Sequence, residues 1–164
     1  MINIDPELLD KALRLLEACR ARGLSLVTVE SCTGGLIAGV LTAVPGSSDV
    51  VDRGFVTYSN EAKMALVGVP GELLADHGAV SEPVARAMAH GGLAHSAADL
   101  AIAVTGIAGP GGGSAVKPVG LVHLAAAARD GRLLHERVVF PGDRAAVRAA
   151  TVLRALDLLE QLTS

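Results

Sequence analysis

The sequence feature that most constrains the fold is a strand-like run that ends in a glycine-containing turn and continues directly as a helical pattern. Residues 24–29 are apolar and mostly β-branched or leucine, and they lead into Glu30-Ser31-Cys32-Thr33-Gly34-Gly35. Apolar residues at helical spacing resume at Leu36. A buried strand, a tight turn and a helix in this order direct backbone N–H groups toward one point above the edge of a sheet. We therefore expect the chemical centre at this turn.

The rest of the chain alternates helical and strand patterns. Helices are expected at residues 6–22, 36–43, 60–67, 72–76, 82–95 and 144–162, and strands at 24–29, 50–58, 99–105, 119–128 and 133–140. Strands separated by helices should be parallel, whereas Arg129-Asp130-Gly131-Arg132 predicts an antiparallel hairpin. The expected fold is an α/β fold, a single three-layer α/β/α domain over residues 1–164 with a mixed, mainly parallel sheet.

Composition narrows the classes of partner and compartment. The net charge of −3 and the 2% aromatic content argue against nucleic acid as a partner. Cys19 and Cys32 offer neither a disulfide framework nor a CxxC metal pair, which favours a reducing, cytoplasmic location. The start of the chain lacks the regions of a signal peptide, and no apolar run is long enough to cross a membrane. The five histidines show no ligand spacing, so no metal site is expected.

Two glycine-rich stretches are candidate binding loops. Residues 34–39 have the glycine spacing of a P-loop, but Val40-Leu41 replaces the required Lys-Ser/Thr pair. Residues 106–114 also lack that pair and contain no GxGxxG pattern. Both stretches could hold a phosphate or an oxyanion through backbone N–H groups; the alternative is that they serve only as tight turns.

Ser31 has two interpretations. A serine just before a helix is most often an N-cap that satisfies backbone donors. It could instead be a nucleophile, although the surrounding sequence has no GxSxG elbow. A nucleophilic serine needs a base, and the chain has only three lysines, Lys11, Lys63 and Lys117. Lys63 follows the second expected strand and should therefore lie at the same sheet edge as Ser31.

Lys63 would act as a base only if it were neutral, and burial can lower a lysine pKa by ~3–5 units. The alternative is a solvated helix residue paired with Glu61, since lysines are seldom buried. Lys117 stands three residues after Ser114 in a formal SxxK pattern that requires a helical turn. Pro118 and the preceding glycines make a helix there improbable.

Four further residues are candidates for the same site. Tyr58, the only tyrosine, ends the strand that leads to Lys63; it could relay a proton or only pack against a helix. Cys32 could replace Ser31 as nucleophile or be an inert buried thiol. Arg144 and Arg148 share one face of the last helix, where they could clamp a phosphate or simply face solvent.

Six blocks of the sequence, taken together and in order, resemble a known family. They are ESCTGG (30–35), GFVTYSNEAK (54–63), GAVSE (78–82), TGIAGPGGG (105–113), KPVG (117–120) and FPGDR (140–144). The chain is similar over nearly its whole length to the C-terminal domain of the competence/damage-inducible CinA family, including its stand-alone nicotinamide-nucleotide amidases. No departure from the family pattern is found within the catalytic blocks. Because the chain begins at the first helix, activity belonging to the extra N-terminal domain of larger CinA proteins is expected to be absent.

The resemblance implies hydrolysis of the carboxamide of nicotinamide mononucleotide to nicotinate mononucleotide and ammonia, without a metal or cofactor. It implies that Ser31 is the nucleophile and Lys63 its base, with Tyr58 assisting. We expect a pyridine nucleotide as the small-molecule partner and a homo-oligomer such as a dimer, with no nucleic acid or membrane partner. The residues predicted to bind the substrate are Glu30, Cys32, Thr33, Gly34, Gly35, Thr105, Gly106, Gly109, Gly111, Gly112 and Arg144.

Two other functions stay open at this point. The chain could be a non-catalytic nucleotide-binding module of a competence or DNA-damage pathway, which would bind its ligand without releasing ammonia. It could also be a β-lactamase-like acyl transferase that uses Ser114 and Lys117, which would require a helix over residues 114–118.

Overall fold

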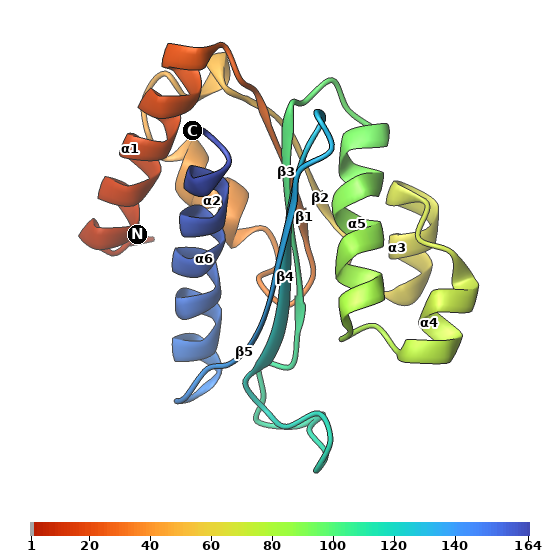
Figure 1. Ribbon diagram of the computed structural model, residues 1–164. Coiled ribbons are helices and arrows are strands. Elements are labelled where there is room, and N and C mark those ends of the chain that lie inside the picture. The colour runs from red at the N-terminus through yellow and green to blue at the C-terminus, as the bar shows by residue number, and fades with distance from the viewer. Residues whose placement is uncertain (1) are drawn as a thin grey trace.

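The computed structural model describes residues 2–164 as a five-stranded sheet with helices on both faces (Figure 1). The strands are β1 (Leu26–Glu30), β2 (Val51–Val56), β3 (Leu100–Gly106), β4 (Leu121–Ala128) and β5 (Leu133–Val139). The helices are α1 (Pro6–Arg22), α2 (Leu36–Thr42), α3 (Asn60–Val67), α4 (Gly71–His77), α5 (Glu82–Ala94) and α6 (Arg144–Gln161), with a short 3-10 helix at Ser47–Asp49. The expected three-layer α/β/α architecture is confirmed.

The strand order is β2-β1-β3-β4-β5. β1 is parallel to both of its neighbours, and β4 is antiparallel to both of its neighbours. β4 therefore runs against the other strands of this sheet, which confirms the mixed, mainly parallel arrangement. The predicted hairpin joins β4 to β5 through residues 129–132.

Each face of the sheet has its own core. α1, α2 and α6 lie on one side, and α3, α4 and α5 lie on the other (Figure 1). β4 is buried along its whole length, whereas the edge strands β2 and β5 are only partly buried. Because aromatics are scarce, leucine, valine and alanine fill most of both cores, and each large side chain among them contributes about 1.5–3 kcal/mol on burial.

The first helix shows how local sequence sets the element bounds. The Asp5 side chain accepts a hydrogen bond from the backbone N–H of Glu7 at 2.7 Å, and Pro6 occupies the first turn. Gly23 ends the helix with φ +66°, and its N–H donates to the carbonyls of Arg20 and Cys19. The predicted bounds of this helix are confirmed.

Four strands, β1, β2, β4 and β5, are shorter than predicted, and the ends of β1 and β2 show why. β1 begins at Leu26, since the N–H of Ser25 donates to Asp99 Oδ2 at 2.9 Å. β2 ends at Val56; the N–H of Thr57 still donates to the Glu30 carbonyl at 2.7 Å, and the chain then turns into α3. The prediction that Tyr58 ends this strand is therefore wrong by two residues.

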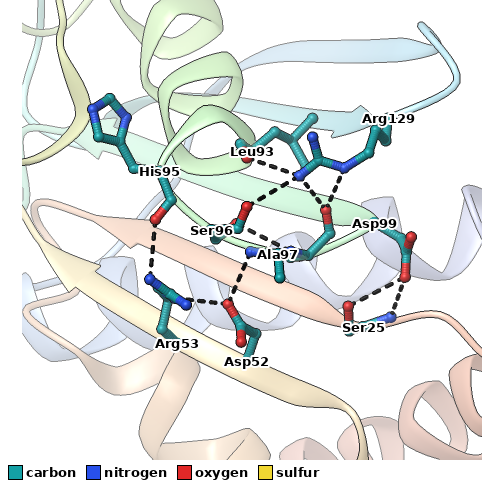
Figure 2. A network of polar contacts seen from close by, with 10 residues as sticks. Ser25, Asp52, Arg53, Leu93, His95, Ser96, Ala97, Asp99 and Arg129 are labelled. Carbon is teal, nitrogen blue, oxygen red and sulfur yellow. Dashed lines mark hydrogen bonds and ion pairs between the residues drawn. The ribbon is translucent and has the colours of Figure 1, made fainter.

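A polar network holds together the connections at the amino ends of β1, β2 and β3. Figure 2 shows Arg129 reaching toward Leu93 and Ser96, and Asp99 next to Ser25. The Arg129 guanidinium donates to the carbonyls of Leu93 at 2.8 Å and Ala98 at 2.6 Å. These contacts fix the connection from α5 to β3, while the loops at the opposite edge of the sheet form the cavities described next.

Candidate active site

The candidate site lies at the carboxyl ends of β1 and β2, where the chain leaves the two strands toward opposite faces of the sheet. The turn after β1 leads into α2 on one face, and the segment after β2 leads into α3 on the other (Figure 1). Ligand sites of open α/β sheets form at such a switch point, because the diverging loops leave a crevice between them. Ser31 approaches this crevice from the first strand and Lys63 from the second.

The Ser31 hydroxyl and the Lys63 amine are in direct contact. Lys63 Nζ lies 3.0 Å from Ser31 Oγ and donates a second hydrogen bond to the Thr57 carbonyl at 2.7 Å. Lys63 is 1% exposed and Ser31 is 7% exposed. The alternative of a solvated Lys63 paired with Glu61 is therefore wrong.

The surroundings of Lys63 favour its neutral form. Burial lowers the pKa of Lys63 from its ordinary value of 10.5, because a charged amine loses its hydration there. Among residues 2–164, Lys63 forms no ion pair with a carboxylate that would oppose this effect. An uncharged amine 3.0 Å from a hydroxyl can accept the hydroxyl proton, which is the chemistry of a nucleophile and its general base.

Glu30 shapes the turn that carries Ser31. Its carboxylate, on a residue 1% exposed, accepts hydrogen bonds from the Thr33 hydroxyl at 2.6 Å and the N–H groups of Ile37 at 2.9 Å and Ala38 at 3.0 Å. Glu30 thus satisfies donors at the start of α2, so Ser31 is not the helix cap and that interpretation was wrong. Two of the residues predicted to bind substrate, Glu30 and Thr33, instead contact each other beneath the turn.

We expect Glu30→Gln to lower the free energy of unfolding by about 1.5–3 kcal/mol, because a buried carboxylate that accepts several hydrogen bonds loses its charge. The matched control is Glu72→Gln, which changes an exposed acid in the first turn of α4. Urea denaturation of both variants measures the difference. Equal stability of the two variants would contradict this structural role for Glu30.

Arg148 contacts the same turn from α6. Its guanidinium donates to the carbonyls of Cys32 at 3.1 Å and Thr33 at 3.2 Å. Within the described part of the chain, the N–H groups of Cys32 and Thr33 have no protein acceptor. With the Cys32 carbonyl held by Arg148, the N–H of Thr33 in the same peptide unit points away from the guanidinium, since the two groups of a planar peptide are opposed.

The mouth of the site is bridged by Tyr58 and Arg144. The Arg144 guanidinium donates to Tyr58 Oη at 3.2 Å and to the Gly109 carbonyl at 2.9 Å. Tyr58 is 63% exposed and contacts Arg144, which disfavours the alternative in which it only packs against a helix. The contact joins the segment after β2 to the glycine-rich loop after β3.

Two adjoining cavities meet at this bridge. The smaller, of about 190 Å³, is lined by Ser31, Cys32, Tyr58, Asn60, Lys63, Ala79, Val80, Thr105, Gly106, Ala108 and Arg144. The larger, of about 680 Å³, is lined by Ala108, Pro110, Val119, Gly142, Asp143, Arg144, Ala145 and Arg148. Arg144 lines both cavities and Arg148 lines the larger one, so the interpretation of both arginines as merely solvent-facing was wrong.

Of the other residues predicted to bind substrate, some line the cavities and others do not. Thr105 and Gly106 line the smaller cavity, and Gly109 offers only its carbonyl to Arg144. Gly111 and Gly112 are exposed and line neither cavity. Gly34 and Gly35 have φ of +59° and +104° and supply the backbone bend of the turn, which is the tight-turn alternative for this loop.

Two alternative nucleophiles are disfavoured by their surroundings. Burial raises the pKa of the Cys32 thiol to about 11, so its reactive thiolate is scarce near neutral pH. Residues 114–118 are not helical, and the Lys117 amine donates to the His77 carbonyl at 2.6 Å. The Ser114–Lys117 interpretation is therefore wrong.

Sequence reasoning missed several contributors to the site, of which three are informative. The Thr57 carbonyl binds the Lys63 amine, and Asn60 and Ala79 line the smaller cavity. Thr57 and Asn60 stand within the GFVTYSNEAK block, so their position beside Tyr58 and Lys63 was an available signal. Ala79 lies in a distant block that only the fold brings close.

No group of three or more His, Cys, Asp or Glu residues within residues 2–164 is arranged to hold a metal ion. None of the helices formed by these residues combines the length and apolar character needed to cross a membrane.

The chain matches a known protein family over nearly its whole length. The family model for the CinA C-terminal domain matches residues 9–163. The chain is 50% identical over 157 residues to the nicotinamide-nucleotide amidohydrolase PncC of Escherichia coli, covering 96% of this chain and 95% of that protein. It is 49% identical to a putative competence-damage inducible protein of Caldicellulosiruptor bescii. That match covers 97% of this chain but only 38% of the longer relative.

Solved structures show the same fold. The competence/damage inducible protein CihA from Agrobacterium tumefaciens superposes with a TM-score of 0.98 at 52% identity and full coverage of both chains. A CinA superfamily protein from Klebsiella pneumoniae superposes with a TM-score of 0.91 at 40% identity, over 95% of this chain and 97% of the other.

Proposed function

This chain belongs to the CinA C-terminal domain family, and from that membership we propose that it is an amidohydrolase that converts nicotinamide mononucleotide into nicotinate mononucleotide and ammonia. The observation that carries the proposal is the buried contact of 3.0 Å between Lys63 Nζ and Ser31 Oγ. The relative of nearly equal length that is named a nicotinamide-nucleotide amidohydrolase supports the choice of substrate.

In the proposed mechanism, Ser31 Oγ attacks the carboxamide carbon while neutral Lys63 takes the hydroxyl proton. The C–N bond of the tetrahedral intermediate then breaks as Lys63 returns that proton to the amide nitrogen, which leaves as ammonia. Ser31 now carries the nicotinoyl group as an ester. Lys63 next removes a proton from a water molecule, the resulting attack breaks the ester, and the proton returns to Ser31 Oγ.

The negative charge of each tetrahedral intermediate would be stabilised by the turn that carries Ser31. The N–H groups of Cys32 and Thr33 have no protein acceptor among the residues described, and Arg148 holds the carbonyls on the other side of this turn. A donor of this kind is typically worth ~2.7–4 kcal/mol in the transition state. Arg148 is thus a positioning residue for the proposed oxyanion site.

The larger cavity is proposed to hold the ribose phosphate of the substrate. It adjoins the Ser31 cavity, and Arg144 and Arg148 contribute guanidinium groups to its lining. Guanidinium groups suit phosphate because they donate parallel hydrogen bonds. Tyr58 would keep Arg144 oriented and contact the nucleotide at the cavity mouth.

The purified protein is expected to release one ammonia for each nicotinate mononucleotide formed. A coupled ammonia assay, with the product identified by mass spectrometry, measures this stoichiometry. The rival function, a non-catalytic nucleotide-binding module, predicts saturable binding of nicotinamide mononucleotide without ammonia, and that result would overturn the proposal.

A further inference from the structure

A third cavity, of about 320 Å³, lies on the α5 side of the sheet. It lies beside the smaller cavity that contains Ser31 and Lys63, called the catalytic cleft below, and is separate from the larger cavity. Its polar lining comes from α4, α5, the loop before β4, and the two strands of the hairpin. The groups concerned are His77, Ser81, Glu82, Lys117, His123 and Arg137.

Two cations of this cavity lack a carboxylate partner. Among residues 2–164, neither Lys117 nor Arg137 forms an ion pair, although the chain carries a net negative charge. The Lys117 amine is held at the cavity by its hydrogen bond to the His77 carbonyl. Arg137 lies directly opposite His123 in the β4–β5 register, so both side chains project from the same face of the sheet.

The one acid of the lining is already engaged. Glu82 forms an ion pair with Arg86 at 2.7 Å, and its other oxygen lies 3.6 Å from His135 Nδ1. The net character of the cavity is therefore cationic, and its unmatched charges suit an anionic ligand.

His123 adds a specific acceptor. It is only 7% exposed, and its Nδ1 lies 2.9 Å from His135 Nε2. Its other ring nitrogen, Nε2, has no hydrogen-bond partner among the described residues of this cavity wall. Burial and the nearby His135, Arg137 and Lys117 lower the pKa of His123 to about 4, with Glu82 opposing them, so the ring is neutral near neutral pH.

The contacts of the histidine pair favour one arrangement of its protons. The Glu82 carboxylate favours the His135 tautomer with its proton on Nδ1, which leaves His135 Nε2 as the acceptor for the proton on His123 Nδ1. His123 Nε2 then presents a lone pair to the cavity. A matching ligand must offer anionic oxygens to Lys117 and Arg137 and one proton to His123.

We propose that this cavity binds a phosphate group that carries one proton. Its oxygens accept hydrogen bonds from Lys117 and Arg137, and its hydroxyl donates to His123 Nε2. Free orthophosphate has this chemistry because its dianion still carries a proton, and a phosphate monoester has it below its second pKa of about 6. Sulfate has the same shape and charge but no proton to donate, so the site should discriminate against it.

The site would share a wall with the catalytic cleft. Val80 lines both cavities, and Thr105, which lines the cleft, pairs with His123 in the β3–β4 register. The Thr105 hydroxyl also donates to the Ala79 carbonyl at 2.9 Å. This cavity shares no lining residue with the one proposed for the substrate phosphate, and phosphate binding here does not depend on the amidase proposal.

The test is a titration of the intact protein with orthophosphate, glycerol phosphate or sulfate at constant ionic strength, followed by the NMR signals of the His123 imidazole. We expect saturable shifts with orthophosphate. Sulfate should bind at least about tenfold more weakly, because it cannot donate the hydrogen bond to His123 Nε2. Glycerol phosphate should bind better at pH 6 than at pH 8, because its protonated form is then more abundant. Binding of orthophosphate alone would identify the free ion as the ligand.

Arg137→Gln should weaken orthophosphate binding about tenfold or more, since it removes a charged donor. Arg14→Gln, an equal charge change at an exposed ion pair on α1, and Arg144→Gln, in the substrate cavity, should leave the titration unchanged. The proposal is overturned if orthophosphate gives no saturable shift, if sulfate binds equally well, or if Arg14→Gln weakens binding as much as Arg137→Gln. Because ammonia release is not the readout, failure here is separable from failure of the amidase proposal.

Discussion

The Ser31→Ala variant is expected to lose ammonia release by about 10⁴-fold or more, as other enzymes do when a catalytic nucleophile is removed. The missing Oγ is the atom that would form the ester, and no other hydroxyl is in contact with the Lys63 amine in the described structure. The fold should persist, because Ser31 does not cap α2 and Lys63 keeps its hydrogen bond to the Thr57 carbonyl. The measurement is single-turnover ammonia release with nicotinamide mononucleotide.

Two comparisons make this test specific. Ser48→Ala changes an exposed serine outside the cavities and should release ammonia at the normal rate. Ser31→Ala should still bind nicotinamide mononucleotide, as calorimetry can measure, since its proposed phosphate contacts lie in the neighbouring cavity. Near-normal turnover in Ser31→Ala would refute the nucleophile assignment.

The Lys63→Met variant is expected to lower kcat by about 10²–10⁴-fold, the usual contribution of a positioned general base. Methionine retains much of the buried side-chain volume but cannot accept a proton. In the unmodified protein, kcat/KM should rise with pH through the lowered pKa of Lys63, because only the neutral amine is the base. Lys63→Met should lose this rise, whereas Lys11→Met, which removes a lysine paired with Asp157, should keep it.

Lys63→Met should also change how the free energy of unfolding depends on pH. Burial lowers the pKa of Lys63 below 10.5, so between the two values the unfolded chain binds more protons than the folded one. The free energy of unfolding of the unmodified protein should therefore rise with pH across this window, relative to Lys63→Met, by at most about 1.4 kcal/mol per pH unit. Urea denaturation at several pH values measures the difference. A difference that stays constant with pH would show that Lys63 is not desolvated.

Much of the fold could be predicted because its signals are local. The β-branched run before Glu30 predicted β1, the caps Asp5 and Gly23 predicted α1, and residues 129–132 predicted the hairpin. The strand ends were less predictable. Ser25 leaves the regular pattern because its N–H bonds to Asp99, a residue distant in sequence, and β2 ends at Val56 although Thr57 still bonds to the Glu30 carbonyl.

The candidate site was predictable where local sequence signals sufficed and not where distant segments meet. Reasoning from strand ends brought Ser31 and Lys63 to one sheet edge, and the structure places their polar atoms in contact. The role of Glu30 was missed because a carboxylate beneath a helix start looks like any other turn residue in sequence. Arg148 and the His123–His135 pair depend on α6 and on strand register, and no local pattern reports such contacts.

The position of Tyr58 has a practical consequence. The chain contains one tyrosine and no tryptophan, and that tyrosine stands exposed at the mouth of the cleft in contact with Arg144. The ultraviolet emission of the unlabelled protein therefore originates almost entirely from this one phenol. Ligand entry that displaces Arg144 or covers the ring changes the signal directly, so the protein carries a built-in optical reporter of cleft occupancy.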